Sequence, residues 1–218
     1  AQAALHDTLF VADYGVHPNT YEDQTARLQT LIADCKRWKS KVIVFQSGRY
    51  DLWPTDASRR EYYISNTSSE TECPSKVKTI GLLFEEMSGL TIEGNDATLM
   101  FHGKMTMLSF AHCKGMRLQN IHFDFERPGG SELTYLKVDA HGVTARVHPD
   151  SKFAIVEGKM MWIGEGWRTN KPHCIEYDPT NKHFYYSRGW NILSQAKAVE
   201  VAPNVVHFAT DLAKDFKE

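Results

Sequence analysis

Residues 82–118 read LLFEEMSGLTIEGNDATLMFHGKMTMLSFAHCKGMRL and contain a repeat carried by strand-like segments. Leu82-Leu83-Phe84 recurs as Leu108-Ser109-Phe110, and Gly89-Leu90-Thr91-Ile92 recurs as Gly115-Met116-Arg117-Leu118, both 26 residues later. Strand-bearing units of this length bury their apolar positions only by stacking on their neighbours. The pattern favours the start of a right-handed parallel β-helix within residues 77–125. An ordinary sheet with an accidental repeat is the alternative.

The residues before this repeat predict a helix followed by a strand. Thr20 and Asp23 resemble an acidic form of the capping box. Apolar residues then recur at helical spacing, namely at Leu28, Leu31, Ile32, Cys35 and Trp38. We therefore expect an amphipathic helix over residues 20–38 that covers the N-terminal end of the coil. The run Val42-Ile43-Val44-Phe45 predicts a strand buried on both faces.

The residues after the repeat predict an antiparallel β-domain. Turn residues separate strand-like runs at Asp139-Ala140-His141-Gly142, Glu157-Gly158 and Asp178-Pro179-Thr180-Asn181. The expected strands span residues 133–138, 143–147, 153–156, 160–163, 174–177, 183–187, 199–201 and 205–208.

A break at Arg127-Pro128-Gly129-Gly130 separates these two parts, because proline and glycine interrupt strands. We therefore expect two domains. Residues 1–128 form the capping helix and the first coils of the β-helix. Residues 129–218 form a small antiparallel barrel or sandwich with a C-terminal tail.

Composition and charge narrow the class of protein. The 218 residues carry 25 Lys and Arg against 27 Asp and Glu, a net charge of −2 that disfavours a nucleic-acid-binding protein. No apolar stretch approaches the roughly 20 residues that a membrane-spanning helix needs. Buried thiols are the simplest interpretation of the cysteines, because their spacing matches no zinc motif: Cys35, Cys73, Cys113 and Cys174.

Several stretches resemble known carbohydrate-active proteins. Val11-Ala12-Asp13-Tyr14-Gly15, the helix after it and Gly48-Arg49-Tyr50 resemble the N-terminal cap of pectate-lyase-like β-helices, although Gln46-Ser47 replaces the usual proline-rich step. More specifically, four stretches of the chain resemble sequences of glycoside hydrolase family 110. They are Tyr62-Tyr63-Ile64-Ser65-Asn66, Leu90-Thr91-Ile92-Glu93-Gly94, Phe101-His102-Gly103-Lys104-Met105 and residues 121–128 (IHFDFERP). The part after residue 128 is similar to a β-domain that this family inserts into its helix.

The resemblance implies an exo-acting α-1,3-galactosidase that releases terminal galactose from glycans and uses no cofactor. It also implies secretion to the periplasm or the medium. The small residues of the opening Ala1-Gln2-Ala3-Ala4 slightly favour a mature end left by cleavage of a signal peptide over the boundary of an expressed fragment.

Length is the main departure from that family. Its members are far longer, and the resemblance places their catalytic carboxylates in later coils. An inverting glycosidase needs two carboxyl groups about 6.5–9.5 Å apart, which stacked strands would present on one face. We therefore interpret the chain as the N-terminal portion of such an enzyme or a shortened relative. The alternative is a non-catalytic carbohydrate-binding or adhesin-like β-helix protein.

Asp124 and Glu126 are the candidate carboxylates of a sugar-contacting groove. They are two residues apart in a predicted strand, so both point to one face while Phe123 and Phe125 point to the other. Arg127 follows them as a candidate substrate contact. A solvated strand face neutralised by this arginine is the simpler alternative, and the identity of the catalytic acid and base stays open.

Aromatic residues concentrate in the last third of the chain, where Trp162 and Trp167 are candidate substrate-binding residues. The other aromatic residues there are Tyr177, Phe184, Tyr185, Tyr186 and Trp190. A flat exposed ring stacks on a sugar, whereas the alternative is that these rings fill the core of the domain.

The histidines do not predict a metal site. His102, His112 and His122 recur every ten residues, which differs from the 26-residue repeat, so they would not stack into a column of ligands. We predict neither a metal nor a cofactor.

The far end of the coil predicts association. No second capping helix follows the repeat, and residues 212–216 (LAKDF) are too short and too charged for that role. Unpaired apolar strands tend to associate. We expect the face formed by residues 108–125 to self-associate or to pair with the remainder of a longer protein.

Overall fold

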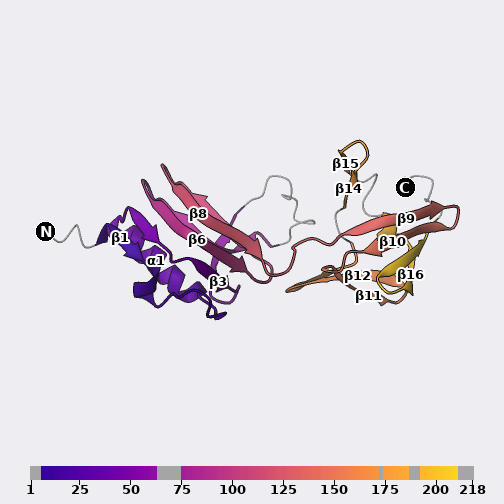
Figure 1. The fold of residues 1–218 in the computed structure, drawn as a ribbon, viewed down its shortest axis with the longest axis horizontal. Coiled ribbons are helices and arrows are strands. Elements are labelled where there is room, and N and C mark those ends of the chain that lie inside the picture. Colours follow the sequence, from indigo (N-terminus) through magenta and orange to yellow (C-terminus); the bar gives the residue numbers. More distant parts are fainter. Residues whose placement is uncertain (1–5, 63–74, 172–173, 187–191, 211–218) are drawn as a thin grey trace. The chain divides into compact units, whose positions relative to one another are not determined.

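The computed structural model describes residues 6–62, 75–171, 174–186 and 192–210. The chain divides into two compact units, Ala1–Glu126 and Arg127–Glu218 (Figure 1). Several sequence-based expectations fall outside the described residues: residues 63–66 of the Tyr62-to-Asn66 stretch, Cys73, Ser187, Trp190 and residues 212–216.

The described residues of the first unit combine helical segments with strands of three to eleven residues. Its helical segments are a 3-10 turn, η2 (Val11–Tyr14), and one α-helix, α1 (Thr25–Trp38). Its strands are β1 (Thr8–Phe10), β2 (Val42–Val44), β3 (Gly48–Leu52), β4 (Ser58–Glu61), β5 (Val77–Glu85), β6 (Thr91–Phe101), β7 (Thr106–Ala111) and β8 (Arg117–Phe125).

The predicted repeat pairs with itself in register. β5 runs parallel to β7 with Leu82 opposite Leu108, and β6 runs parallel to β8 with Ile92 opposite Leu118. β1, β2 and β6 are parallel neighbours, and β3 also pairs in parallel with β6 (Figure 1). Residues that are 26 positions apart in the repeat therefore lie opposite each other in neighbouring parallel strands.

Gly94 shows how closely the repeated strands approach. A Cβ atom at this position would lie 2.2 Å from the carbonyl oxygen of Asn120 and 2.5 Å from Cβ of Ile121. No side chain fits there. The described sheets are open and do not form a closed or complete solenoid. The predicted right-handed β-helix therefore stays a prediction.

Helix α1 starts later than the sequence predicts. It begins at Thr25 rather than at residue 20, because Tyr21 has a φ of 56° that a right-handed helix excludes. The expected capping box is wrong as well. Thr20 Oγ1 accepts a hydrogen bond from the backbone N–H of Glu22, and it is Asp23 Oδ1 that accepts the N–H of Thr25, at 2.9 Å.

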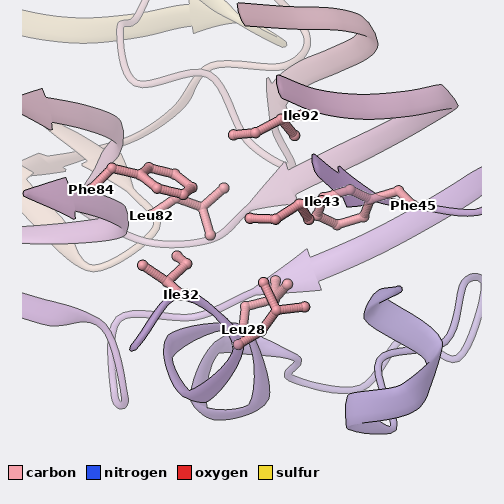
Figure 2. Close-up of a pocket in the computed structure, with 8 residues that line it drawn as sticks. Leu28, Ile32, Ile43, Phe45, Leu82, Phe84 and Ile92 are labelled. Carbon is pink, nitrogen blue, oxygen red and sulfur yellow. The ribbon is translucent and has the colours of Figure 1, made fainter. Parts of the chain in front are cut away.

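The apolar face of α1 packs against the strands of the first unit, and the residues predicted to form this face are the ones that do so. Leu28, Leu31 and Ile32 line an apolar pocket together with strand residues Ile43, Phe45, Leu82, Phe84 and Ile92. Figure 2 shows Leu28 and Ile32 pointing from the helix toward these strand side chains. The helix thus covers these strands through an apolar interface.

Strand β2 is buried on one face only, contrary to expectation. Ile43 and Phe45 are buried, whereas Val42 and Val44 are half-buried. In a strand these pairs point to opposite faces. The β-branched run was therefore a correct signal for a strand and an incorrect signal for burial on both sides.

The second unit contains all eight strands expected from the sequence. They are β9 (Leu133–Asp139), β10 (Gly142–Val147), β11 (Lys152–Val156), β12 (Lys159–Gly164), β14 (Ile175–Asp178), β15 (His183–Tyr186), β16 (Lys197–Ala202) and β17 (Val205–Ala209). The sequence did not predict strand β13 (Trp167–Thr169) or the short helix α2 (Ile192–Gln195).

Antiparallel pairing holds the second unit together. The hairpins β9–β10, β11–β12 and β14–β15 turn where the sequence predicts. The β16-β17-β10-β9 sheet and the β11-β12-β13 sheet share one core, which includes Val143 and Phe208 from the first and Met160 and Trp162 from the second. The described sheets are not closed, so the structure supports an antiparallel β-domain without a complete barrel.

No helix in the described part of the chain combines the length and the apolar character that crossing a bilayer requires.

Candidate functional site

The candidate site lies on one face of the sheet formed by β3, β6 and β8. Asp51 of β3 pairs with Met100 of β6, and Met100 pairs with Asp124 of β8. The intervening residues Tyr50, Leu52, Leu99 and Phe101 are buried in the core. Because side chains alternate along strands, the opposite face presents the polar ones. We call this side the polar face and define it by Arg49, Asp51, His102, Asp124 and Glu126.

Asp51 is the centre of a buried network on the polar face. Its side chain is 1% exposed, and Oδ1 accepts a hydrogen bond from Arg49 Nη2 at 2.6 Å. Arg49 Nε lies 3.0 Å from both carboxylate oxygens. The same Oδ1 lies 2.8 Å from His102 Nε2. A buried carboxylate is stable only with such partners.

These partners control the ionisation of Asp51. Burial alone would raise the pKa of its carboxyl group, but hydrogen bonds from Arg49 and His102 outweigh that effect and hold the pKa below its ordinary value. The same carboxylate raises the pKa of Arg49. Asp51 is therefore ionised at neutral pH.

Arg49 joins Asp51 to Glu126. Its Nη2 donates to Asp51 Oδ1 and also to Glu126 Oε2, across 77 residues of sequence. The guanidinium also lies over the ring of Tyr21, 5.0 Å from the ring centroid. One arginine thus fastens β3 to the residue that directly follows β8.

The network continues to the start of helix α1 through Trp53. The indole stacks on the His102 ring with centroids 3.8 Å apart and an angle of 7° between the planes. The backbone N–H of Trp53 donates to Thr25 Oγ1 at 3.0 Å, and Thr25 Oγ1 donates to the Trp53 carbonyl at 3.2 Å. The helix, β3 and the end of β6 are therefore fixed to one another.

The chemistry open to this network is limited. Ligand atoms of Asp51, His102 and Glu126 lie within 4.8 Å of one another, a spacing a metal ion could bridge. The Arg49 guanidinium already contacts both carboxylates, and its fixed positive charge opposes a cation there. A general acid also needs a raised pKa, whereas that of Asp51 is lowered. The network is suited to holding the strands in place.

The two carboxylates predicted from the sequence have different surroundings. Asp124 and Glu126 are exposed while Phe123 and Phe125 are half-buried, as strand alternation predicts. Glu126 pairs with Arg49. Asp124 Oδ1 accepts the backbone N–H of Phe125 at 2.8 Å. The structure places both on the polar face, and a role in a sugar-contacting groove stays a prediction.

The other three predicted site residues belong to the second unit. Arg127 Nη2 donates to the Ile163 carbonyl at 3.2 Å. Trp162 is 8% exposed and lies in the core, so its ring has no face free for a sugar. Trp167 is half-buried against the same core and lies over Gly164, where a Cβ would meet the indole at 1.9 Å.

Sequence reasoning missed Arg49, Asp51 and Trp53 as members of the site. Arg49 and Asp51 alternate with Tyr50 and Leu52, so their shared face was readable from strand periodicity. Their partners lie about 50 and 77 residues away, at His102 and Glu126. No local pattern joins residues that far apart.

The second unit matches a family model for the GLAA-B beta-barrel domain I over residues 131–218. The chain is also similar to an alpha-1,3-galactosidase A from Bacteroides fragilis strain YCH46, with 53% sequence identity over 210 aligned residues. The alignment covers 96% of this chain and 35% of the relative.

Two more distant relatives carry similar names. An alpha-1,3-galactosidase B from Phocaeicola vulgatus is 34% identical over 89% of the chain and 32% of its own length. An alpha-1,3-galactosidase A from Bacteroides thetaiotaomicron is 32% identical over 80% of the chain and 30% of its own length. The chain therefore spans about a third of the length of these curated relatives.

Proposed function

Because the chain belongs to glycoside hydrolase family 110 and corresponds to the N-terminal part of its α-1,3-galactosidases, we propose that it is the N-terminal portion of an enzyme that releases terminal galactose from glycans. The observation that carries this proposal is the 53% identity over 96% of the chain to an alpha-1,3-galactosidase A. The names of the relatives are those of enzymes, so they do not favour a non-catalytic adhesin-like protein.

The scaffold of this enzyme is a right-handed parallel β-helix in our proposal. The in-register stacking of β5 on β7 and of β6 on β8 supports it, because each successive coil of such a helix pairs in parallel with the last. In this arrangement α1 covers the first coil. The antiparallel unit after residue 126 is an insertion between coils.

The catalytic acid and base lie outside these 218 residues in this proposal. The mechanism is exo-acting and inverting, with one protonated carboxyl group and one carboxylate that activates water. Asp51 is unsuited to the role of the acid, because hydrogen bonds from Arg49 and His102 hold its pKa below the ordinary value. Glu126 pairs with the same Arg49 guanidinium. The enzyme is secreted or periplasmic, where its glycan substrates are found.

The test compares the 218-residue chain with the complete natural gene product. Both are assayed on a chromogenic α-galactoside and on an oligosaccharide that ends in α-1,3-linked galactose. We expect the complete protein to release galactose with inversion of the anomeric carbon and the 218-residue chain to release none.

Two results would contradict this proposal. Turnover by the 218-residue chain that Asp124→Asn or Glu126→Gln abolishes would place the catalytic carboxylates on the polar face. Failure of the complete protein to release galactose from either substrate would remove the function itself.

A further inference from the structure

We propose that the ring of Tyr21 and the exposed part of the polar face beside it bind a sugar ring. We call this place the Tyr21 site and define it by Tyr21, Arg49 and Glu126, which all belong to the first unit. The inference rests on the proposed function only in taking a glycan as the ligand. It assigns these residues to binding and leaves the catalytic carboxylates elsewhere.

Tyr21 has a backbone conformation that is costly for its residue type. Its φ of 56° lies in the left-handed region, which glycine and asparagine adopt far more readily than a bulky side chain does. Among the non-glycine residues that the structure describes with a positive φ, Tyr21 is the one tyrosine, phenylalanine or tryptophan. The turn alone does not explain a tyrosine here, because asparagine would form it at lower cost. Strained positions of this kind cluster at ligand-binding places.

Hydrogen bonds before and after Tyr21 hold its loop against β3. The backbone N–H of Asn19 donates to the Arg49 carbonyl at 2.7 Å, and Asn19 Oδ1 accepts the N–H of Arg49 at 3.0 Å. Beyond Tyr21, the N–H of Gln24 donates to the Asp51 carbonyl at 2.9 Å. The strained backbone of Tyr21 is therefore fixed from both sides at the edge of the polar face.

The strain brings no burial to the tyrosine ring. Tyr21 is 66% exposed, and the Arg49 guanidinium lies over its ring, 5.0 Å from the centroid. A cation–π contact at so exposed a position contributes only modestly to stability. An aromatic residue that is strained, held in place and still open to solvent is suited to binding a ligand rather than to packing.

Hydrogen-bonding groups surround the same guanidinium. Arg49 pairs with the carboxylate of Glu126, whose side chain is 43% exposed and so keeps acceptor capacity toward solvent. In register with Arg49 across the sheet, Thr98 and His122 continue the polar face with a hydroxyl and an imidazole group. An exposed aromatic ring therefore lies beside both donors and acceptors.

This combination fits a pyranose. One face of a sugar ring presents C–H groups, which stack on the negative face of an aromatic ring. In galactose, the axial hydroxyl leaves several adjacent C–H groups together on one face. The sugar hydroxyls need acceptors and donors at the edge of the stack, which Glu126 and Arg49 supply. A stable protein partner would need about 800 Å² on each side, far more than one ring among charged groups offers.

The experiment is a titration of the 218-residue chain with α-1,3-galactobiose, followed by saturation-transfer nuclear magnetic resonance. We expect transfer from the chain to the galactose protons. Tyr21→Ala should weaken the binding about tenfold, and Tyr21→Phe should keep it because the stacking ring remains. Tyr177→Ala, at a 52% exposed tyrosine of the second unit, is the matched control and should bind like the unaltered chain.

Tyr21→Asn separates binding from folding. Asparagine adopts a positive φ at lower cost than tyrosine, so this variant should keep or raise the melting temperature while it loses the sugar. A tyrosine with a structural role alone would give the reverse result, a lower melting temperature with unchanged binding.

Three results would overturn the proposal. They are the absence of saturation transfer to α-1,3-galactobiose, equal binding by Tyr21→Ala and the unaltered chain, and that reverse result for Tyr21→Asn. Galactose release by the complete protein is measured separately, so failure of the Tyr21 site and failure of the enzymatic function can be told apart.

Discussion

Leu82 lies directly opposite Leu108 in the parallel pairing of β5 with β7. Leu82 is 3% exposed, whereas Leu108 is only half-buried. The same difference separates Phe84 from Phe110 and Ile92 from Leu118. Strands β7 and β8 thus repeat the apolar side chains of β5 and β6 but leave them only half-buried.

The half-buried apolar side chains of the face formed by residues 108–125 predict that the isolated chain associates. Static light scattering over a range of concentrations should show self-association. Phe110→Lys should shift the chain toward the monomer, and circular dichroism checks that the variant is folded, because the Phe110 ring also packs against buried Phe84 with centroids 5.2 Å apart. Phe10→Lys, at a 50% exposed site on β1, is the matched control and should associate like the unaltered chain. A chain that stays monomeric at every concentration would contradict this prediction.

Helix α1 should contribute strongly to stability through its apolar face. Leu31 is 1% exposed in the interface between the helix and the strands, so Leu31→Ala should lower the free energy of unfolding by about 2–5 kcal/mol. Thr30→Ala, on the exposed face of the same helix, should change it by less than about 0.5 kcal/mol. Urea denaturation followed by circular dichroism measures both. Similar values for the two variants would mean that this face of the helix does not pack against the strands.

The ionised carboxylate of Asp51 should matter at neutral pH and lose its effect in acid. Asp51→Asn leaves Arg49 without its main partner and should cost about 3–5 kcal/mol at pH 7. The folded-state pKa of Asp51 is lowered, so its contribution is complete above the unfolded value near 4 and disappears as the pH falls through the folded-state value.

Denaturation curves from pH 7 down to pH 3 test this dependence. The difference between the unaltered chain and Asp51→Asn should stay constant at neutral pH and narrow below about pH 4. Asp124→Asn, at an exposed site in register with Asp51, should show a much smaller difference. If the difference in the free energy of unfolding between the unaltered chain and Asp51→Asn grew as the pH fell, Asp51 would not be the stabilising carboxylate that we assign.

Cys35 should be inert in the folded chain. It is fully buried, and burial raises the pKa of its thiol to about 11, so the reactive thiolate is scarce at pH 8. Mass spectrometry after brief treatment with iodoacetamide should find Cys35 unmodified in the native chain and modified in urea. Rapid labelling of Cys35 under native conditions would show that helix α1 opens readily.

The sequence by itself determined the elements whose signals are local or periodic. The repeat of Leu82-Leu83-Phe84 at Leu108-Ser109-Phe110 identified strands that pair in register. The apolar spacing of Leu28, Leu31 and Ile32 identified the buried face of α1, and turn residues located three hairpins. Each of these signals lies within one segment or in the spacing between two copies of it.

The tertiary structure decided what depends on groups distant in sequence. Helix α1 begins at Thr25, after the turn at Tyr21, and Asp23 there accepts hydrogen bonds both from Thr25 and from Trp53, 30 residues away. Asp51 is the centre of a buried network because folding brings His102 to the Asp51 carboxylate and Glu126 to Arg49. Trp162 is buried while Phe184 is exposed, although both occupy strands of the same unit. Which aromatic face meets solvent depends on how the sheets pack, because a strand signal is the same for a core ring and an exposed one.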